Sequence, residues 1–260
     1  MRRHFVPLLS LLFAATGTAV AQDQPSSEFV QVLTVTIKPG GVTEYEDYIK
    51  KVIGAFAKAG APQQVFTYQP GPGAPSYTYE FVLPFNKWSE LDAFPAVPQL
   101  LAKAYGEVLA ASMLKAGRSN VERSETVVHR LLRSLSAPRI PQHAFANVIM
   151  TEVEPSQASL YELYLAKVKA AQDQTPGTPT TLRFVSVQGP AATYVTVQFF
   201  NKFAERDSAP AAGDALRKAY GEAEARHLTE ASLRAIRHRR TYISGFRPDL
   251  SRTGAAPATK

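Results

Sequence analysis

Residues 85–88 read Phe-Asn-Lys-Trp and residues 200–203 read Phe-Asn-Lys-Phe, while Lys-Ala-Tyr-Gly-Glu occurs both at 103–107 and at 218–222. Both pairs of segments are 115 residues apart. Chance matches rarely keep the same spacing at two separate places in a chain. The sequence therefore predicts two copies of one structural unit, and this duplication decides the fold.

The two copies are predicted to cover residues 29–136 and 145–251, with a linker at 137–144 between them. Tyr45 in the first copy corresponds to Tyr161 in the second at a spacing of 116 residues, so the match extends through the first helix of each unit. The linker contains two prolines, which predicts a short, stiff connection.

Each copy carries the pattern of a β-α-β-β-α-β unit. Alternating apolar residues predict a strand over 29–38, and apolar residues at three- and four-residue spacings predict a helix over 42–58. A proline- and glycine-rich turn at 70–75 separates two further strands. In the second copy, the second helix is predicted as one element over 212–234.

The predicted fold class is α+β, with two tandem ferredoxin-like repeats. A unit of this kind has a four-stranded sheet with both helices on one face, so its other face is uncovered. Two such units in one chain bury both open faces if the faces meet. The repeats are therefore expected to form one pseudo-dimeric α/β barrel.

This element order, the repeat length and the duplicated segments at 85–88 and 200–203 resemble the dimeric α/β-barrel superfamily. That superfamily includes antibiotic-biosynthesis monooxygenases, haem-degrading monooxygenases, EthD-like and NIPSNAP-like proteins. The resemblance implies one eight-stranded barrel per chain, and it suggests oxygenase chemistry without supplying a catalytic motif.

The N-terminus predicts export. Residues 1–21 combine Arg2 and Arg3, an apolar run and a small-residue end, the three zones of a signal peptide, with cleavage expected near Ala21. The sequence leaves open whether the signal is of the Sec or the twin-arginine type. The mature protein is then periplasmic or secreted, with a flexible leader at 22–28 and a disordered tail at 252–260.

Composition narrows the function classes. The chain has no cysteine, so it has neither a disulfide framework nor thiolate chemistry. Its formal net charge of +7 is a moderate excess that gives no reason to expect nucleic acid as a partner. The apolar run near the start is about half of the roughly 20 residues that a membrane span needs, and no later segment is apolar enough.

Tyr105 and Tyr220 occupy matching positions on the second helix of each copy, and each is followed by a glycine that suggests close backbone packing. In haem-degrading relatives a histidine on this helix holds the iron, and the resemblance places the two tyrosines near that position. Tyrosine can ligate haem, but the histidine is missing from both copies. No cofactor is therefore predicted, and haem is kept as an alternative.

The histidines are the other polar candidates. His227 is aligned with Met113 of the first copy, which predicts either a core histidine or a site residue present in one half only. His129 corresponds to Ser244 at the spacing of 115 residues. Their spacing is not that of a metal-binding motif, so no metal is predicted.

Aromatic residues give the sheet and its flanks a heavy apolar load. Tyr79, Tyr194 and Trp88 are candidates for lining a ligand pocket, and the alternative is that they fill the barrel. A basic cluster at 234–240 lies at the start of the last predicted strand. These charges either keep a strand end in solvent or bind an anionic partner.

These observations favour a protein that binds a small apolar or aromatic molecule between sheet and helices. One alternative is a cofactor-independent or haem-linked monooxygenase, because cofactor-free oxygenation needs only a shaped pocket and a few polar groups. The other is a structural or assembly protein that forms homo-oligomers through its outer helices. Whether the protein is an enzyme is left open by the sequence.

Overall fold

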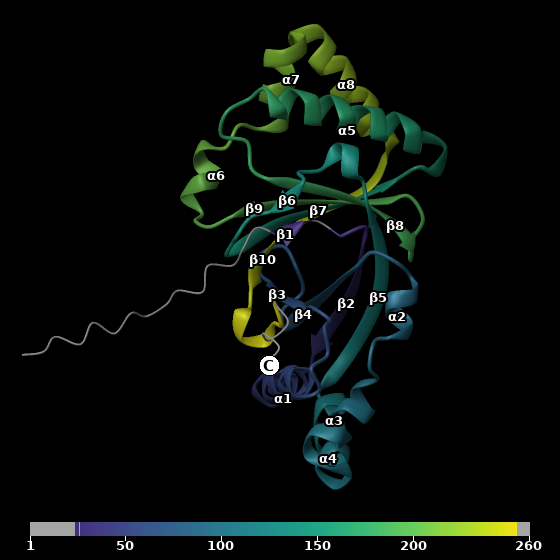
Figure 1. Cartoon of the computed structure of the whole chain (residues 1–260). Coiled ribbons are helices and arrows are strands. Elements are labelled where there is room, and N and C mark those ends of the chain that lie inside the picture. The colour runs from purple at the N-terminus through teal and green to yellow at the C-terminus, as the bar shows by residue number, and fades with distance from the viewer. Residues whose placement is uncertain (1–23, 26, 254–260) are drawn as a thin grey trace, which may run out of the picture.

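The computed structural model describes residues 24–25 and 27–253 (Figure 1). The predicted signal peptide and most of the predicted tail lie outside these residues. The principal elements, in chain order, are β1 (Gln24–Pro25), β2 (Phe29–Ile37), α1 (Val42–Lys58), β3 (Phe66–Pro70), β4 (Thr78–Phe85), α2 (Ser89–Asp92), α3 (Val97–Tyr105), α4 (Glu107–Ser119), β5 (Val121–Leu131), β6 (Arg139–Ile140), β7 (Phe145–Val153), α5 (Ala158–Asp173), β8 (Thr181–Gln188), β9 (Thr193–Phe200), α6 (Ala204–Ser208), α7 (Ala212–Tyr220), α8 (Glu222–Ala235) and β10 (Ile236–Phe246).

Eight of these strands close into one antiparallel barrel in the order β10-β3-β4-β2-β5-β8-β9-β7. The strands from the N-terminal half are adjacent to one another, and so are those from the C-terminal half. The two groups join where β10 pairs with β3 and where β5 pairs with β8. The predicted α+β class and the eight-stranded barrel are confirmed.

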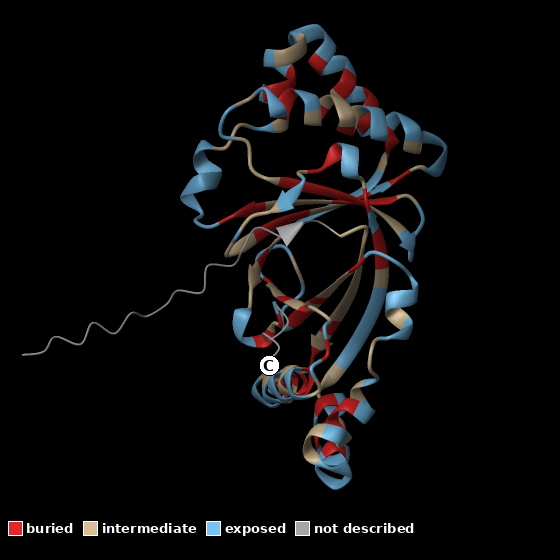
Figure 2. Cartoon of the chain, in the orientation of Figure 1, coloured by how far each residue is buried: buried red, intermediate tan, exposed pale blue. Residues whose placement is uncertain are grey.

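The helices cover the outside of the barrel on two opposite sides. In Figure 1, α1, α3 and α4 lie on one side and α5, α7 and α8 on the other. Val35 and Ile37 of β2 point outward and pack with Tyr45 of α1, which is buried as the helical spacing predicts. Tyr161 of α5 is buried in the same way. Figure 2 shows the buried residues gathered on the strands and on the helix faces that meet them.

The second helix of each half is broken at a glycine. Helix α3 ends and α4 begins around Gly106, which has φ of 84°, and α7 gives way to α8 around Gly221, which has φ of 81°. A Cβ at either position would meet nothing within 4 Å. The prediction of close backbone packing, and of one helix over 212–234, is therefore wrong. These glycines supply positive φ at a bend, which side chains disfavour.

Both ends of the described chain are held to the fold. Strand β1 pairs with β6, so part of the predicted leader contacts the linker. Arg252, which prediction assigned to the tail, is buried and donates hydrogen bonds to the carbonyl oxygens of Ala61 and Gln63. Among the described residues, the structure has no helix that is long and apolar enough to cross a membrane.

Candidate functional site

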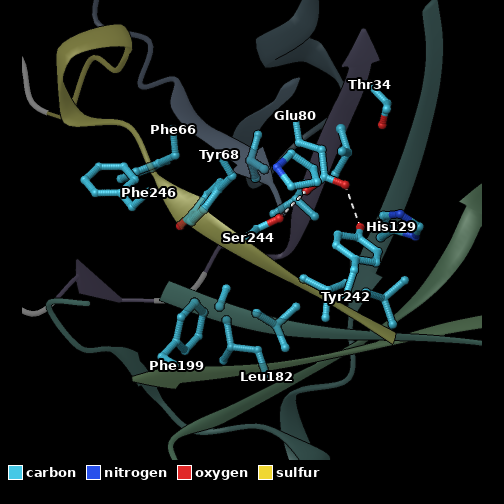
Figure 3. Close-up of a pocket in the computed structure, with 18 of the residues that line it drawn as sticks. Thr34, Phe66, Tyr68, Glu80, His129, Leu182, Phe199, Tyr242, Ser244 and Phe246 are labelled. Atoms are coloured by element: carbon cyan, nitrogen blue, oxygen red, sulfur yellow. Dashed lines mark hydrogen bonds between the residues drawn. The ribbon is translucent and has the colours of Figure 1, made fainter. Parts of the chain in front are cut away.

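The barrel encloses a cavity of about 1010 Å³ (Figure 3). Alternate residues of each strand face it, since successive side chains of a strand point to opposite sides of the sheet. Thus Thr34 and Thr36 of β2 line the cavity while Val35 and Ile37 face α1. A cavity of this size holds a drug-sized organic molecule.

Most of the cavity wall is apolar. The C-terminal half supplies this wall from strands β7, β8 and β9, with these side chains: Ala146, Val148, Met150, Leu182, Phe184, Val195, Val197 and Phe199. Val32, Val82 and Val127 continue it on the N-terminal half. Phe199 contributes an aromatic ring to this wall.

Glu80 is the central polar group of the cavity. The Tyr242 hydroxyl donates to Glu80 Oε1 at 2.5 Å, and the Ser244 hydroxyl donates to Oε2 at 3.3 Å (Figure 3). Burial raises the pKa of the Glu80 carboxyl group, against the opposing effect of these two hydrogen bonds. Burial and the nearby Glu80 carboxylate also raise the pKa of the Tyr242 hydroxyl, so it remains a donor.

Two histidines line the cavity in their neutral form. Burial lowers the pKa of His129 to about 4, and its Nδ1 lies 3.1 Å from the Ser186 hydroxyl. Burial also lowers the pKa of His143, whose Nδ1 donates to the Pro141 carbonyl oxygen at 2.8 Å. That bond leaves Nε2 of His143 as an acceptor, and the Tyr68 hydroxyl donates to it at 2.8 Å.

Aromatic rings pack around Tyr68 and His143. The Tyr68 ring lies 5.5 Å from the Phe246 ring and 5.8 Å from the His143 ring, and His143 lies 4.4 Å from Phe199. These four residues, which we call the aromatic cluster, all line the cavity. Tyr68 faces Glu80 directly in the β3–β4 register, so the aromatic cluster begins beside the carboxylate.

Three further charged groups line the cavity. Arg123 and Glu125 of β5 form an ion pair with each other at 3.0 Å. Arg240, from the basic cluster at 234–240, lies over the Tyr242 ring at 5.2 Å and donates to the Met150 sulfur at 3.3 Å. One residue of that basic cluster, Arg240, therefore lines the cavity, where it contacts Tyr242 and Met150.

The sequence suggested seven pocket residues. Of these, His129 lines the cavity and the other six do not. Tyr79 and Tyr194 instead point outward and donate to carboxylates on the first helix of their own half, at 2.6 Å to Glu46 and 2.8 Å to Glu162. Tyr79 is 0% exposed. They fix helix to sheet, in matching positions of the two halves.

Tyr105 and Tyr220 also hold helices together. Their hydroxyls donate to the carbonyl oxygens of Lys51 and Lys167 on the first helix of each half. A smaller hollow of about 510 Å³, lined by Tyr105, Gly106, Glu107, Val108, Leu109 and Ser112, lies on the surface. It shares no lining residue with the barrel cavity.

His227 and Trp88 lie away from the cavity. His227 is exposed on α8, whereas the buried neighbour Leu228 stands where Met113 stands in the first half. The alignment of His227 with Met113 was wrong by one residue, which moved it to the wrong helix face. Trp88 is 48% exposed and packs against Phe29 and Phe85.

At the position that the resemblance implies for haem, the N-terminal half has neither a histidine nor an unbonded tyrosine hydroxyl. The space between first and second helices of the N-terminal half is filled by apolar side chains, including Phe56, Leu101 and Met113. The Tyr105 hydroxyl is engaged by a carbonyl oxygen rather than open toward a cofactor. In the described residues, the second helices carry one histidine, His227, and it is exposed.

Sequence reasoning missed Glu80 and Tyr242. The signal for them was the failure of the internal match: Glu80 corresponds to Val195 and Tyr242 to Val127 at the spacing of 115 residues. The same kind of mismatch did single out His129 and Ser244, and both line the cavity. The cavity lies on the inner face of the sheet, whereas the sequence predicted a ligand between the sheet and the helices.

Comparison with known proteins identifies the fold. No family model matches the sequence, and no curated protein matches it. Among solved structures, a proposed monooxygenase from Lactobacillus acidophilus NCFM has a TM-score of 0.53 at 12% identity, covering 88% of this chain and 97% of that one. An anthrone oxidase-like protein has a TM-score of 0.50 at 13% identity, covering 93% of this chain and 99% of that one.

A mutant chlorite dismutase from Candidatus Nitrospira defluvii has a TM-score of 0.53 at 9% identity, covering 86% of this chain and 93% of that one. Identities this low establish a shared fold and nothing about the reaction. The chain therefore has the barrel fold of monooxygenase-like and chlorite dismutase-like proteins.

Proposed function

We propose that the protein binds a small, largely apolar molecule inside the barrel. The observation that carries this proposal is the cavity of about 1010 Å³, with a mainly apolar wall and a few hydrogen-bonded polar groups gathered around Glu80. Ligand sites commonly combine an apolar lining with a small number of polar groups that fix the orientation.

The test uses the neutral fluorophore N-phenylnaphthylamine, whose emission rises in an apolar site. We expect saturable binding to the wild-type protein. Val197→Trp fills part of the cavity wall and should weaken binding at least about tenfold, because a bulky indole removes ligand space. Leu163→Trp, on an exposed face of α5, is the matched control and should bind as the wild type does. Equal binding by both variants contradicts the proposal.

A second candidate is an enzyme that oxygenates an activated aromatic without a cofactor. It is favoured by Glu80, whose raised pKa suits a general base, and by fold neighbours described as monooxygenases and an anthrone oxidase-like protein. Glu80 would accept a proton from an activated methylene carbon of the substrate. Dissolved oxygen would then oxidise the resulting carbanion, one oxygen atom entering as a carbonyl group and the other leaving as water. Ser244 and Tyr242 would hold the carboxylate in place.

Oxygen uptake with dithranol as substrate tests this second candidate. The wild type should consume oxygen above the uncatalysed rate, and Glu80→Gln should lose that excess. Glu230→Gln changes an exposed carboxylate on α8 that does not line the cavity, so it should keep the activity. Loss of activity in both variants, or in neither, would contradict the role of Glu80.

We further propose that each half is a ferredoxin-like unit and that the chain is an exported, fused pair of them. The support is the matched strand order, β3-β4-β2-β5 and β8-β9-β7-β10, and the signal-like pattern of residues 1–21. N-terminal sequencing of the protein from periplasm should give a start near Gln22. A start at Met1 would refute export by cleavage.

A further inference from the structure

We propose that the ligand of this cavity is an organic cation, with its protonated nitrogen against Glu80 and its apolar part along the aromatic cluster and the valine-lined wall. This inference rests on the proposed binding function and adds the charge of the ligand to it. It follows from three independent features: an unpaired carboxylate, adjoining aromatic rings and neutral histidines.

The first feature is that Glu80 has hydrogen bonds but no ion pair. Its two partners, Tyr242 and Ser244, are neutral hydroxyl groups. Arg240 attracts Glu80 at longer range, yet no ion pair joins Arg240 to Glu80 in the part of the chain that the structure describes. A buried carboxylate without a counter-ion is costly, and a ligand cation would supply the missing charge.

The other charged groups of the cavity are already engaged. Arg123 and Glu125 neutralise each other, and Arg240 lies over Tyr242 with a hydrogen bond to Met150. Arg240 keeps its positive charge but is exposed to solvent, so Glu80 is the charged group of the cavity that lacks both an ion-pair partner and full solvation. An anionic ligand would be repelled by Glu80, whereas a cation would be attracted.

The second feature is the set of rings beside Glu80. Tyr68 is opposite Glu80 in the β3–β4 pairing, and Phe246 and His143 follow within 6 Å of its ring. The faces of aromatic rings carry negative potential and attract ammonium groups. A carboxylate with adjoining aromatic rings is a combination that binds amines rather than carboxylates or phosphates.

The third feature is that the histidines add no positive charge near neutral pH. Burial lowers the pKa of His129 to about 4, and the bonds of His143 to Pro141 and Tyr68 fit its neutral form. Neither histidine therefore competes with the ligand for Glu80. The matching position of the other half is Val195. Among the described lining residues, Glu80 is therefore the one carboxylate without an ion pair, and it defines one orientation for the ligand.

The experiment compares three indoles of nearly equal size as competitors of bound N-phenylnaphthylamine at about pH 7.5. Tryptamine is a cation, tryptophol is neutral and indoleacetate is an anion at this pH. We expect tryptamine to displace the fluorophore at a concentration at least about tenfold lower than tryptophol, with indoleacetate the weakest. In Glu80→Gln the advantage of tryptamine over tryptophol should vanish. In Glu230→Gln it should persist, because Glu230 is exposed on α8 and does not line the cavity.

The possible failures are distinguishable. If the fluorophore does not bind the wild type, the proposed binding function fails. If it binds but tryptophol competes as well as tryptamine, the cavity binds apolar molecules and the cation inference is overturned. If Glu80→Gln fails to fold, as circular dichroism would show, the wild-type comparison of the three indoles still decides the matter.

Discussion

The neutral, buried state of His129 makes a quantitative prediction about acid stability. His129 is 6% exposed, and burial lowers its pKa from 6.5 to about 4. In the unfolded chain the same imidazole titrates near its ordinary value, so between these two pKa values the unfolded state binds more protons. Stability from His129 is therefore fully present above the unfolded pKa and is lost as the pH falls toward the folded pKa.

The magnitude follows from the size of the shift. A difference of about 2.5 pKa units corresponds to about 3 kcal/mol once the pH is below both values. Between about pH 7.5 and about pH 5, the part lost is about 2 kcal/mol, since the folded imidazole is still mostly neutral at the lower pH. This loss is a large fraction of the stability of an ordinary domain.

The assay is equilibrium urea unfolding, followed by far-ultraviolet circular dichroism at several pH values in that range. His129→Gln keeps a polar side chain beside Ser186 and does not titrate, so its free energy of unfolding should fall about 2 kcal/mol less than that of the wild type. His238→Gln removes an exposed histidine and should follow the wild type. Parallel pH profiles for His129→Gln and the wild type would refute the reasoning, because His143 and the carboxylates are common to both.

Two further predictions concern packing outside the cavity. Arg183 is buried and donates to the Leu135 carbonyl oxygen, so Arg183→Ala should lower the free energy of unfolding by about 2–4 kcal/mol in urea titrations through unsatisfied groups and a cavity; a loss below about 0.5 kcal/mol would contradict this. Gly117→Ala places a Cβ 2.6 Å from the Tyr48 ring and should cost about 1–3 kcal/mol by the same assay. Gly213→Ala, whose Cβ meets an arginine nitrogen only at 3.8 Å, should be neutral or slightly stabilising, and equal losses in both variants would rule out the steric explanation.

The sequence predicted the architecture because its signals are local and repeated. Alternation at Thr34 and Val35 predicts a strand with two different faces, and the helical spacing that includes Tyr45 predicts a face packed on the sheet. The repeated units, each with an open sheet face, then favour a barrel. The bend at Gly106 was missed because one glycine in a helical pattern costs only about 1 kcal/mol and gives no sign of its φ.

The site was harder to predict because barrel closure changes the environment of one sheet face. Glu80 alternates with outward-facing Tyr79 and Phe81, so in a single strand it looks like an ordinary solvent-facing residue. Barrel closure places the face of β4 that carries Glu80 inside the barrel. Tyr242, which is 162 residues further along the chain, then donates a hydrogen bond to Glu80. The aromatic residues that were predicted to line a pocket include Tyr79 and Tyr194. Both lie on the outer face of the sheet, where their hydroxyls donate to carboxylates on the helices.

The hydrogen bonds of Glu80 cross the join between β3–β4 and β10, so they link segments 162 and 164 residues apart in sequence. Contacts of such high sequence separation require a long loop to close, so we expect them to form late in folding. A cavity ligand that touches Glu80 and Phe246 would connect β4 of the N-terminal half with β10, the last strand. By mass action it would stabilise the closed barrel over forms with β10 detached, and hydrogen exchange of β10 amides should slow when the ligand is bound.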